Sequence, residues 1–175
     1  VPMTNLAAED SLGEADLPVR LVGETPCFRR EAGAYGKETR GLVRVHQFDK
    51  VELVEIVRPD TSYQELERLV GCAERVLEAL ELPYRVVLLA SGDLSFAAAM
   101  CYDLETYAPA EDRWLEVSSC SNFEDFQARR IGLRYRSEGG KLEFPHTLNG
   151  SGLALPRVFV SLLEVHQTKA GTIRI

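Results

Sequence analysis

The spacing of hydrophobic residues predicts one long amphipathic helix near the middle of the chain. Between residues 62 and 82, apolar side chains recur at intervals of three and four, which places them on one helical face: Leu66, Leu69, Val70, Ala73, Val76, Leu77 and Leu80. Thr61 or Ser62 can cap the start, Glu65 has the spacing of a capping box, and Pro83 ends the helix. We interpret the charged residues of the opposite face as a solvated surface.

Apolar segments with strand-like spacing lie on both sides of this helix. Residues 18–29 and 42–57 are typical of an antiparallel hairpin, joined by a long loop that is rich in Gly and charge. Shorter strands are expected at 84–90, 102–108, 114–118, 141–148 and 172–175, and further helices at 123–134 and 153–167. A Gly-rich turn is expected at 149–152. Antiparallel strands grouped around long helices predict an α+β fold, with an antiparallel sheet flanked by helices, in which residues 1–175 form one domain.

The composition is that of an ordinary globular protein. The 175 residues are 45% hydrophobic and 27% charged, and no apolar run approaches the length of a membrane span, so no membrane partner is expected. The chain opens on Val1 without an initiator Met, which predicts a fragment of something longer. The net charge of −7, taken alone, argues against a dedicated nucleic-acid binder.

Common catalytic and metal-binding motifs are absent from the sequence. The four cysteines are far apart and lack zinc-ligand spacing, so we expect buried free thiols in a reducing compartment: Cys27, Cys72, Cys101 and Cys120. There is no Walker motif, no GxGxxG after a strand and no GxSxG elbow.

Arginines gather on the predicted hairpin. Arg29, Arg30, Arg40 and Arg44 lie within sixteen residues, and strand alternation places Arg29 and Glu31 on the same face. A guanidinium suits phosphate oxygens, and a carboxylate accepts from a purine amino group, so this pair could bind a nucleotide. A cross-strand ladder of ion pairs is the alternative at this point.

Two further positions could contribute to such a site. Glu116 has a serine nearby at a strand end, and these hard oxygen ligands suit Mg²⁺ that is bound mainly through phosphates. Arg157 near a helix start could clamp a phosphate. A partly buried capping glutamate and a surface arginine are the alternatives.

The order of these residues resembles a known pattern. FRREAG (residues 28–33) followed by RGLVRVHQFDKVE (40–52) resembles motif 2 of class II aminoacyl-tRNA synthetases, in the form found in seryl-tRNA synthetases. SSCSNFEDFQARR (118–130) and HTLNGSGLA (146–154), with Arg157, resemble a later strand segment and motif 3 of the same family. The opening VPMTN is similar to the stretch after the family's Thr-x-Glu serine-recognition loop. The resemblance covers nearly the whole chain.

The resemblance implies an ATP site on the hairpin. Arg29 would contact both the α-phosphate and the seryl carboxylate, and Glu31 would accept from the adenine amino group. Phe48 would stack on one adenine face while Arg157 covers the other and reaches the γ-phosphate. The catalytic residues implied are Arg29 and Arg157. Arg30 stands where serine is commoner in the family, so only a backbone contact to ATP is expected there.

Further roles implied by the resemblance complete the nucleotide site. Arg44 would bind the terminal phosphate, and Val45 would lie under the nucleotide. Glu116 and Ser119 would bind Mg²⁺. The backbone of the whole segment would line the ATP pocket: Glu116, Val117, Ser118 and Ser119.

The resemblance also implies a serine pocket. Glu52 would pair with the substrate ammonium or hydroxyl group, and Ser151, with Asn149 nearby, would complete the pocket together with Arg29. A polar pocket of this kind selects serine because the wrong amino acid leaves its groups unpaired.

The function that follows is an ATP- and Mg²⁺-dependent ligase that activates L-serine and transfers it to tRNA(Ser), and also to tRNA(Sec), as a cytoplasmic homodimer. The family's Thr-x-Glu loop, motif 1 and N-terminal coiled-coil arm are absent, so this chain alone is expected to be inactive, and its charge no longer argues against a tRNA partner. Two alternatives keep the same fold. One is a synthetase-like binding or regulatory protein, and the other is a ligase that loads amino acids onto carrier proteins.

Overall fold

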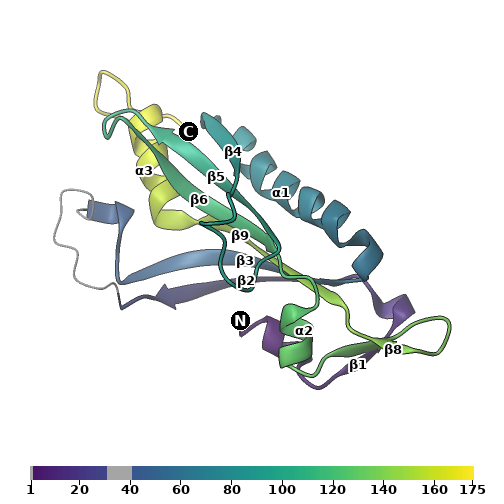
Figure 1. Ribbon diagram of the computed structural model, residues 1–175. Coiled ribbons are helices and arrows are strands. Elements are labelled where there is room, and N and C mark those ends of the chain that lie inside the picture. Colours follow the sequence, from purple (N-terminus) through teal and green to yellow (C-terminus); the bar gives the residue numbers. More distant parts are fainter. Residues whose placement is uncertain (1, 31–40) are drawn as a thin grey trace.

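The computed structural model describes residues 2–30 and 41–175. Its centre is a six-stranded antiparallel sheet in the order β2-β3-β9-β6-β5-β4 (Figure 1). The strands are β2 (Val19–Phe28), β3 (Gln47–Val57), β4 (Tyr84–Leu88), β5 (Met100–Ala108), β6 (Arg113–Asn122) and β9 (His146–Ala154). The helices are α1 (Ser62–Ala79), α2 (Phe126–Arg130) and α3 (Leu155–Val165). The predicted α+β class with an antiparallel sheet is confirmed.

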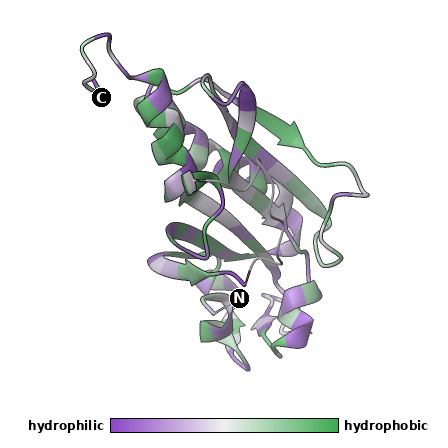
Figure 2. Ribbon diagram, turned by 90° about the vertical axis from the view of Figure 1, so that its left-hand side faces the viewer, coloured by the Kyte–Doolittle hydropathy of each residue, from purple (hydrophilic) through white to green (hydrophobic). Residues whose placement is uncertain are grey.

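Helices α1 and α3 pack on the same face of the sheet and form the larger core with it (Figures 1 and 2). Leu66 and Leu77 of α1, Val117 and Leu148 of the sheet and Val158 of α3 are all buried there. Burying a side chain of this size stabilises the fold by about 1.5–3 kcal/mol each. The helices therefore hold one face of the sheet rigidly, and the other face is available for a site.

A smaller layer covers one end of that other face. The strands β1 (Ser11–Gly13), β7 (Arg134–Arg136) and β8 (Leu142–Glu143) form a second sheet, in which β1 and β7 are parallel. Ile56 of β3 is buried against Ala128 of α2 and Leu133. This layer leaves the opposite end of β3, near Phe48, uncovered.

The central helix is confirmed, but its ends and polar contacts differ from the prediction. It stops at Ala79, and no side chain caps its start. Ser62 Oγ donates to the Pro59 carbonyl at 3.2 Å, and the Glu65 carboxylate pairs with Arg20 and Arg68. The capping-box prediction is therefore wrong, because two guanidinium groups hold the glutamate.

The charged face of α1 is also less solvated than expected. Arg68 pairs with Glu55 of β3, a carboxylate that is only 3% exposed. Glu67 accepts a hydrogen bond from the Tyr102 hydroxyl at 2.8 Å, and Glu78 accepts one from Tyr84 at 3.0 Å. This ion pair and these two hydrogen bonds connect the helix to the sheet.

The largest error concerns residues 149–152, which form part of β9 and not a turn. A Cβ at Gly150 would lie 2.7 Å from Cys120 Sγ and 3.0 Å from Leu69 Cδ2. The glycine is needed because the strand approaches its neighbours closely, not because the backbone reverses. Helix α3 consequently begins at Leu155 rather than two residues earlier.

Other boundaries were predicted only in part. The helix expected at 123–134 is the short α2, and the strand expected at 141–148 is divided between β8 and the start of β9. Only an isolated bridge between Gln167 and Ile173 lies near the expected last strand.

All four cysteines are free, but Cys27 and Cys72 are only half-buried. Within the described residues, no helix is long and apolar enough to cross a membrane.

Candidate active site

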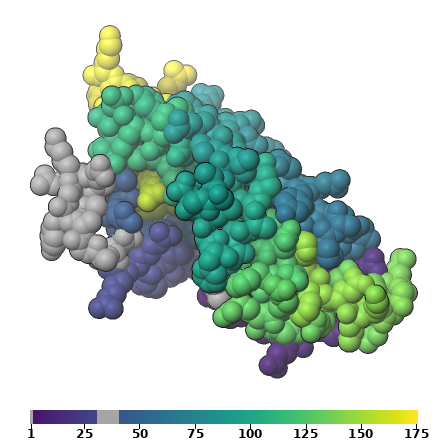
Figure 3. All heavy atoms as spheres, in the orientation of Figure 1, coloured from purple at the N-terminus to yellow at the C-terminus, as the bar shows by residue number. Residues whose placement is uncertain are grey.

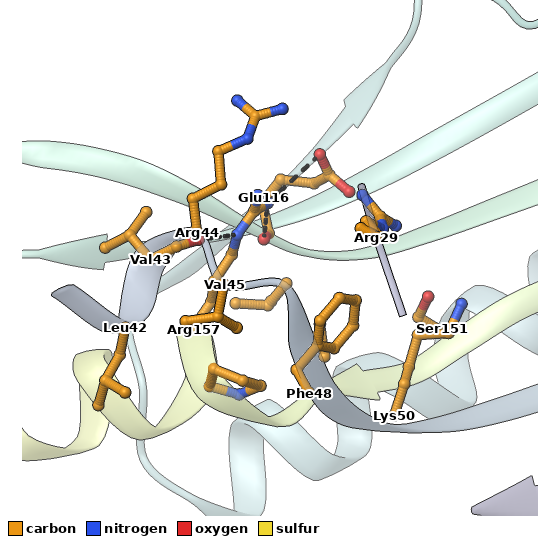
Figure 4. A pocket seen from close by; sticks show the side chains of 13 residues that line it. Arg29, Leu42, Val43, Arg44, Val45, Phe48, Lys50, Glu116, Ser151 and Arg157 are labelled. Atoms are coloured by element: carbon orange, nitrogen blue, oxygen red, sulfur yellow. Dashed lines mark hydrogen bonds and ion pairs between the residues drawn. The ribbon is translucent and has the colours of Figure 1, made fainter. Parts of the chain in front are cut away.

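A pocket opens on the uncovered face, where the β2–β3 hairpin, β6, β9 and the start of α3 meet (Figures 3 and 4). Side-chain alternation along β3 directs Phe48 and Lys50 to this face. The lining residues are Arg29, Leu42, Val43, Arg44, Val45, Phe48, Lys50, Glu116, Val117, Ser151, Ala154, Pro156 and Arg157.

Arg29 lies at one wall of the pocket, directly after β2. Its backbone N–H donates to the His46 carbonyl at 2.8 Å, and His46 Nδ1 lies 3.1 Å from the Arg29 carbonyl. These contacts fix the hairpin where it leaves the sheet. The Arg29 guanidinium lies over the Phe48 ring, 5.3 Å from its centroid. A cation and an aromatic face are thus presented together, as a nucleotide site requires.

Arg157 crosses the opposite side of the pocket from the first turn of α3, where Pro156 is well placed because its missing N–H needs no partner. Its Nε donates to the Val43 carbonyl at 3.1 Å, and its Nη1 donates to the Glu116 carbonyl at 2.8 Å. The same Nη1 lies 3.6 Å from Glu116 Oε2 (Figure 4). Arg157 therefore links three separate parts of the chain.

A β-bulge brings Glu116 and Ser119 to the same face of β6. Leu104 pairs with Ser118 and Glu105 pairs with Glu116, so Val117 is an extra residue in the ladder. Val117 is buried as part of the helix-side core but also contributes to the pocket lining, as does Glu116. Without the bulge, residues three apart on a strand would point to opposite faces.

Ser119 lies on the open face together with an acidic neighbour that the sequence analysis missed. Ser119 Oγ is 3.2 Å from Cys101 Sγ, and that sulfur is 3.7 Å from Asp103 Oδ1. Asp103 is also the cross-strand partner of Ser119. The register in which β5 pairs with β6 could not be read from the sequence, so Asp103 was not predicted as a site residue.

The Glu116 carboxyl is partly buried and has charges of both signs around it. Partial burial raises the pKa of the Glu116 carboxyl, and Asp103 adds to the rise, whereas Arg157 and Arg29 oppose it. A carboxylate and a hydroxyl on one half-open face are hard oxygen donors, which fits Mg²⁺ that takes its other ligands from phosphates and water. Among the residues that the structure describes, no three or more His, Cys, Asp or Glu side chains form a group that could hold a metal ion.

A second group of polar residues lies next to the nucleotide end. Glu52 of β3 pairs with Ser151 of β9, and Asn149 lies two residues before Ser151 on the same strand. Lys50 Nζ lies 2.6 Å from Glu52 Oε2. Ser118 Oγ donates to the Ser151 carbonyl at 2.6 Å, which fixes the backbone of β9 at this point. The arrangement offers a carboxylate, a hydroxyl and an amide to a small polar molecule.

The structure brings most of the predicted site residues together. Those that line the pocket are Arg29, Arg44, Val45, Phe48, Glu116, Val117, Ser151 and Arg157. Four others flank it on the same strands without lining it: Glu52, Ser118, Ser119 and Asn149. Arg30 is exposed and lies outside the lining. Glu31 and Arg40 lie outside the described residues.

Five lining residues were not predicted: Leu42, Val43, Lys50, Ala154 and Pro156. Lys50 could have been found, because it lies two residues from both Phe48 and Glu52 and so shares their face of the strand. Val43 could not, because it contributes its carbonyl oxygen, which any residue type supplies.

Comparison with known proteins gives one family over almost the entire chain. Residues 1–166 match the model of the tRNA synthetase class II core domain (G, H, P, S and T).

Individual relatives agree with this match. A serine–tRNA ligase of Acidithiobacillus ferrooxidans is 60% identical, and one of Prosthecochloris aestuarii is 57% identical, each over 100% of this chain and 41% of the relative. The crystal structure of seryl-tRNA synthetase from Pyrococcus horikoshii complexed with ATP superposes with a TM-score of 0.95 at 44% identity. That match covers 99% of this chain and 39% of the other. The chain thus spans about two fifths of the length of the relatives that it matches.

Proposed function

This chain belongs to the class II tRNA synthetase core-domain family, and on that premise we propose that it forms the serine-activating core of a serine–tRNA ligase. The predicted family resemblance is confirmed by the match. The activity is a proposal because the relatives that carry the name are more than twice as long.

One observation carries the proposal: a subsite suited to a nucleotide and a subsite suited to a small polar molecule share one face of the sheet. Arg29, Phe48 and Arg157 line the first. Glu52 and Ser151 are paired across β3 and β9 beside it. An enzyme that joins a small amino acid to a nucleotide needs both subsites in contact, since positioning is the main source of its rate.

The residues suit adenylate formation. In this reaction the serine carboxylate attacks the α-phosphorus of ATP, a new O–P bond forms, and pyrophosphate leaves. Arg29 is proposed to contact both the carboxylate and the α-phosphate, and so to stabilise the charge that builds between them. Phe48 and Arg157 are proposed to hold adenine between them, with Arg157 also reaching the γ-phosphate, and Arg44 is proposed to bind the terminal phosphate. No side-chain nucleophile is required.

Glu116 and Ser119 are the residues proposed to hold Mg²⁺, because their oxygens share the open face next to the pocket. When bound, Mg²⁺ would neutralise phosphate charge. The protein's part is to present these two oxygens on the same face of the sheet as Arg29 and Arg157.

The rest of the assignment concerns the whole protein. Glu52, Ser151 and Asn149 are proposed to bind the ammonium and hydroxyl groups of L-serine. The names of the relatives support tRNA(Ser) as the acceptor, and tRNA(Sec), a homodimer and a cytoplasmic location are proposed with it.

Serine-dependent exchange of pyrophosphate into ATP tests this function in the purified full-length protein, of which this chain forms part. We expect exchange with serine and not with alanine, because only serine satisfies the polar pocket. Glu52→Gln should abolish exchange, and Glu24→Gln on the exposed part of β2 is the matched control. A folded protein that binds ATP without exchange would point to a binding or regulatory role. Transfer of serine to a carrier protein and not to tRNA would point to the other alternative.

A further inference from the structure

Arg157 lies against Glu116, the carboxylate proposed to bind Mg²⁺. Its Nη1 contacts both the carbonyl oxygen and the carboxylate of Glu116, at 2.8 and 3.6 Å. The Glu116 side chain is half exposed, so a cation from solvent could reach it. The pocket therefore supplies positive charge to this carboxylate, from Arg157 in ion-pair contact and also from Arg29.

Neighbouring charges make this contact more than a surface ion pair. Glu105 is the cross-strand partner of Glu116 and is neutralised by Arg85, whose Nε lies 2.6 Å from Glu105 Oε2. Asp103 is the next carboxylate on the open face. With Glu105 paired, Arg157 is the charged side chain in ion-pair contact with Glu116 among the described residues.

A divalent cation and the Arg157 guanidinium cannot both bind Glu116 without additional negative charge, because like charges at contact distance repel strongly. The phosphates of a nucleotide supply that charge. They also offer the guanidinium better acceptors than the carboxylate it holds, since Arg–phosphate contacts are frequently bidentate.

We propose that Arg157 makes metal binding at Glu116 conditional on nucleotide: it holds the carboxylate while the pocket is empty and releases it when phosphates draw the guanidinium away. This inference rests on the proposed Mg²⁺ role of Glu116 and goes beyond it, because it fixes the order of binding. The metal binds tightly only together with the nucleotide or after it.

The test uses Mn²⁺ alone as the probe and follows the electron paramagnetic resonance signal of the free ion. Without nucleotide, wild-type protein should bind Mn²⁺ weakly. Arg157→Ala, which weakens ATP binding, should nevertheless bind Mn²⁺ at least about tenfold more tightly, because the carboxylate has lost its competitor. Arg157→Ala combined with Glu116→Gln should return the affinity to the wild-type level.

Arg129→Ala is the matched control, because Arg129 pairs with Asp125 on α2, away from the pocket. It removes the same charge and should leave Mn²⁺ affinity unchanged. Circular dichroism checks folding, and Arg157→Gln repeats the test with a side chain of similar length.

Calorimetric titration of ATP into wild-type protein, with and without Mn²⁺, separates this inference from the proposed function. Tight ATP binding together with unchanged Mn²⁺ affinity in both Arg157 variants would overturn the inference alone. Equal Mn²⁺ affinity of wild-type protein in the presence and absence of ATP would overturn it as well. Failure of wild-type protein to bind ATP at all would overturn the proposed function, whatever the Arg157 variants show.

Discussion

The change Gly150→Ala tests whether close packing of β9 on the helix-side core sets the geometry of the serine subsite. The new Cβ would lie 2.7 Å from Cys120 Sγ and 3.0 Å from Leu69 Cδ2. Both neighbours are fully buried, and both belong to the core around α1. Neither can move without displacing other core side chains, so the strand itself must shift.

Overpacking of this kind costs about 1–3 kcal/mol, and we expect about 2 kcal/mol from two close contacts. The shift should also appear in function, because Asn149 and Ser151 flank Gly150 on the same strand. The KM for serine in pyrophosphate exchange should rise more than the KM for ATP.

Urea denaturation of four proteins measures the effect: wild type, Gly150→Ala, Cys120→Ala and the double variant. Cys120→Ala alone should cost about 1 kcal/mol, the scale for losing one buried group. The double variant should be more stable than the sum of the single changes by about 1 kcal/mol, because the nearer clash is gone while Leu69 remains.

Gly71→Ala is the matched control. Gly71 lies inside α1, and a Cβ there meets only Arg75 Nη1, at 3.7 Å. Alanine in a helix interior is favoured over glycine by about 1 kcal/mol, so this variant should gain stability. Additive costs in the double variant, or a Gly150→Ala protein as stable as wild type, would refute the packing argument.

Three further changes test the site and the interior. Arg29→Ala should lower pyrophosphate exchange by at least about 10²–10³-fold, the scale for removing one positioned donor, and should leave the circular dichroism spectrum unchanged. Arg30→Ala should lower exchange little, since Arg30 is exposed and lies outside the pocket lining. Burial lowers the pKa of His146 below its usual value. As the pH falls below about 6.5, the unfolded chain therefore takes up the proton before the folded protein does, and the folded protein loses stability. Urea midpoints at pH 7.5 and 5.5 should differ more in wild type than in His146→Gln. Arg68→Ala should destabilise by about 3 kcal/mol in urea denaturation, because it leaves the buried Glu55 carboxylate with a more distant partner.

Each of these has a contrary outcome. Near-normal exchange in Arg29→Ala would remove that residue from the reaction. Equal loss of stability at low pH with and without His146 would show that other groups cause it. Adding Glu55→Gln to Arg68→Ala should restore part of the lost stability, and no recovery would mean that packing, not charge, explains the cost.

Local patterns in the sequence predicted the parts of the fold that depend on local forces. The periodicity of α1 was correct because its apolar stripe, which includes Leu66 and Leu77, is buried by the sheet as the spacing implied. The β2–β3 hairpin was also predicted correctly, and its two strands pair in antiparallel register from Val19 to Phe28. The capping box failed because Glu65 is held by Arg20, which is 45 residues away in the chain.

Most of the candidate site was predicted by motif resemblance rather than by physical pattern. Spacing alone left Arg29 and Arg157 as possible surface residues, and only the order of motifs joined them. The structure adds what neither source contains: the Val43 carbonyl and the Asp103 carboxylate reach the site through strand pairing and backbone position. Such contacts depend on the register between distant strands, which composition and alternation do not specify.

Two bulges explain why simple alternation misassigns the site strands. Gly152 is extra in the β3–β9 ladder, as Val117 is in the β5–β6 ladder. After Gly152, Leu153 turns into the helix-side core, and Ser151 and Ala154, three residues apart, both line the pocket. Period-two alternation would instead have placed Leu153 beside Ser151, with an apolar side chain in a polar subsite. The bulge at Gly152 therefore moves the apolar Leu153 out of the site and brings Ala154 in, whereas the bulge at Val117 brings Ser119 to the open face in place of Ser118.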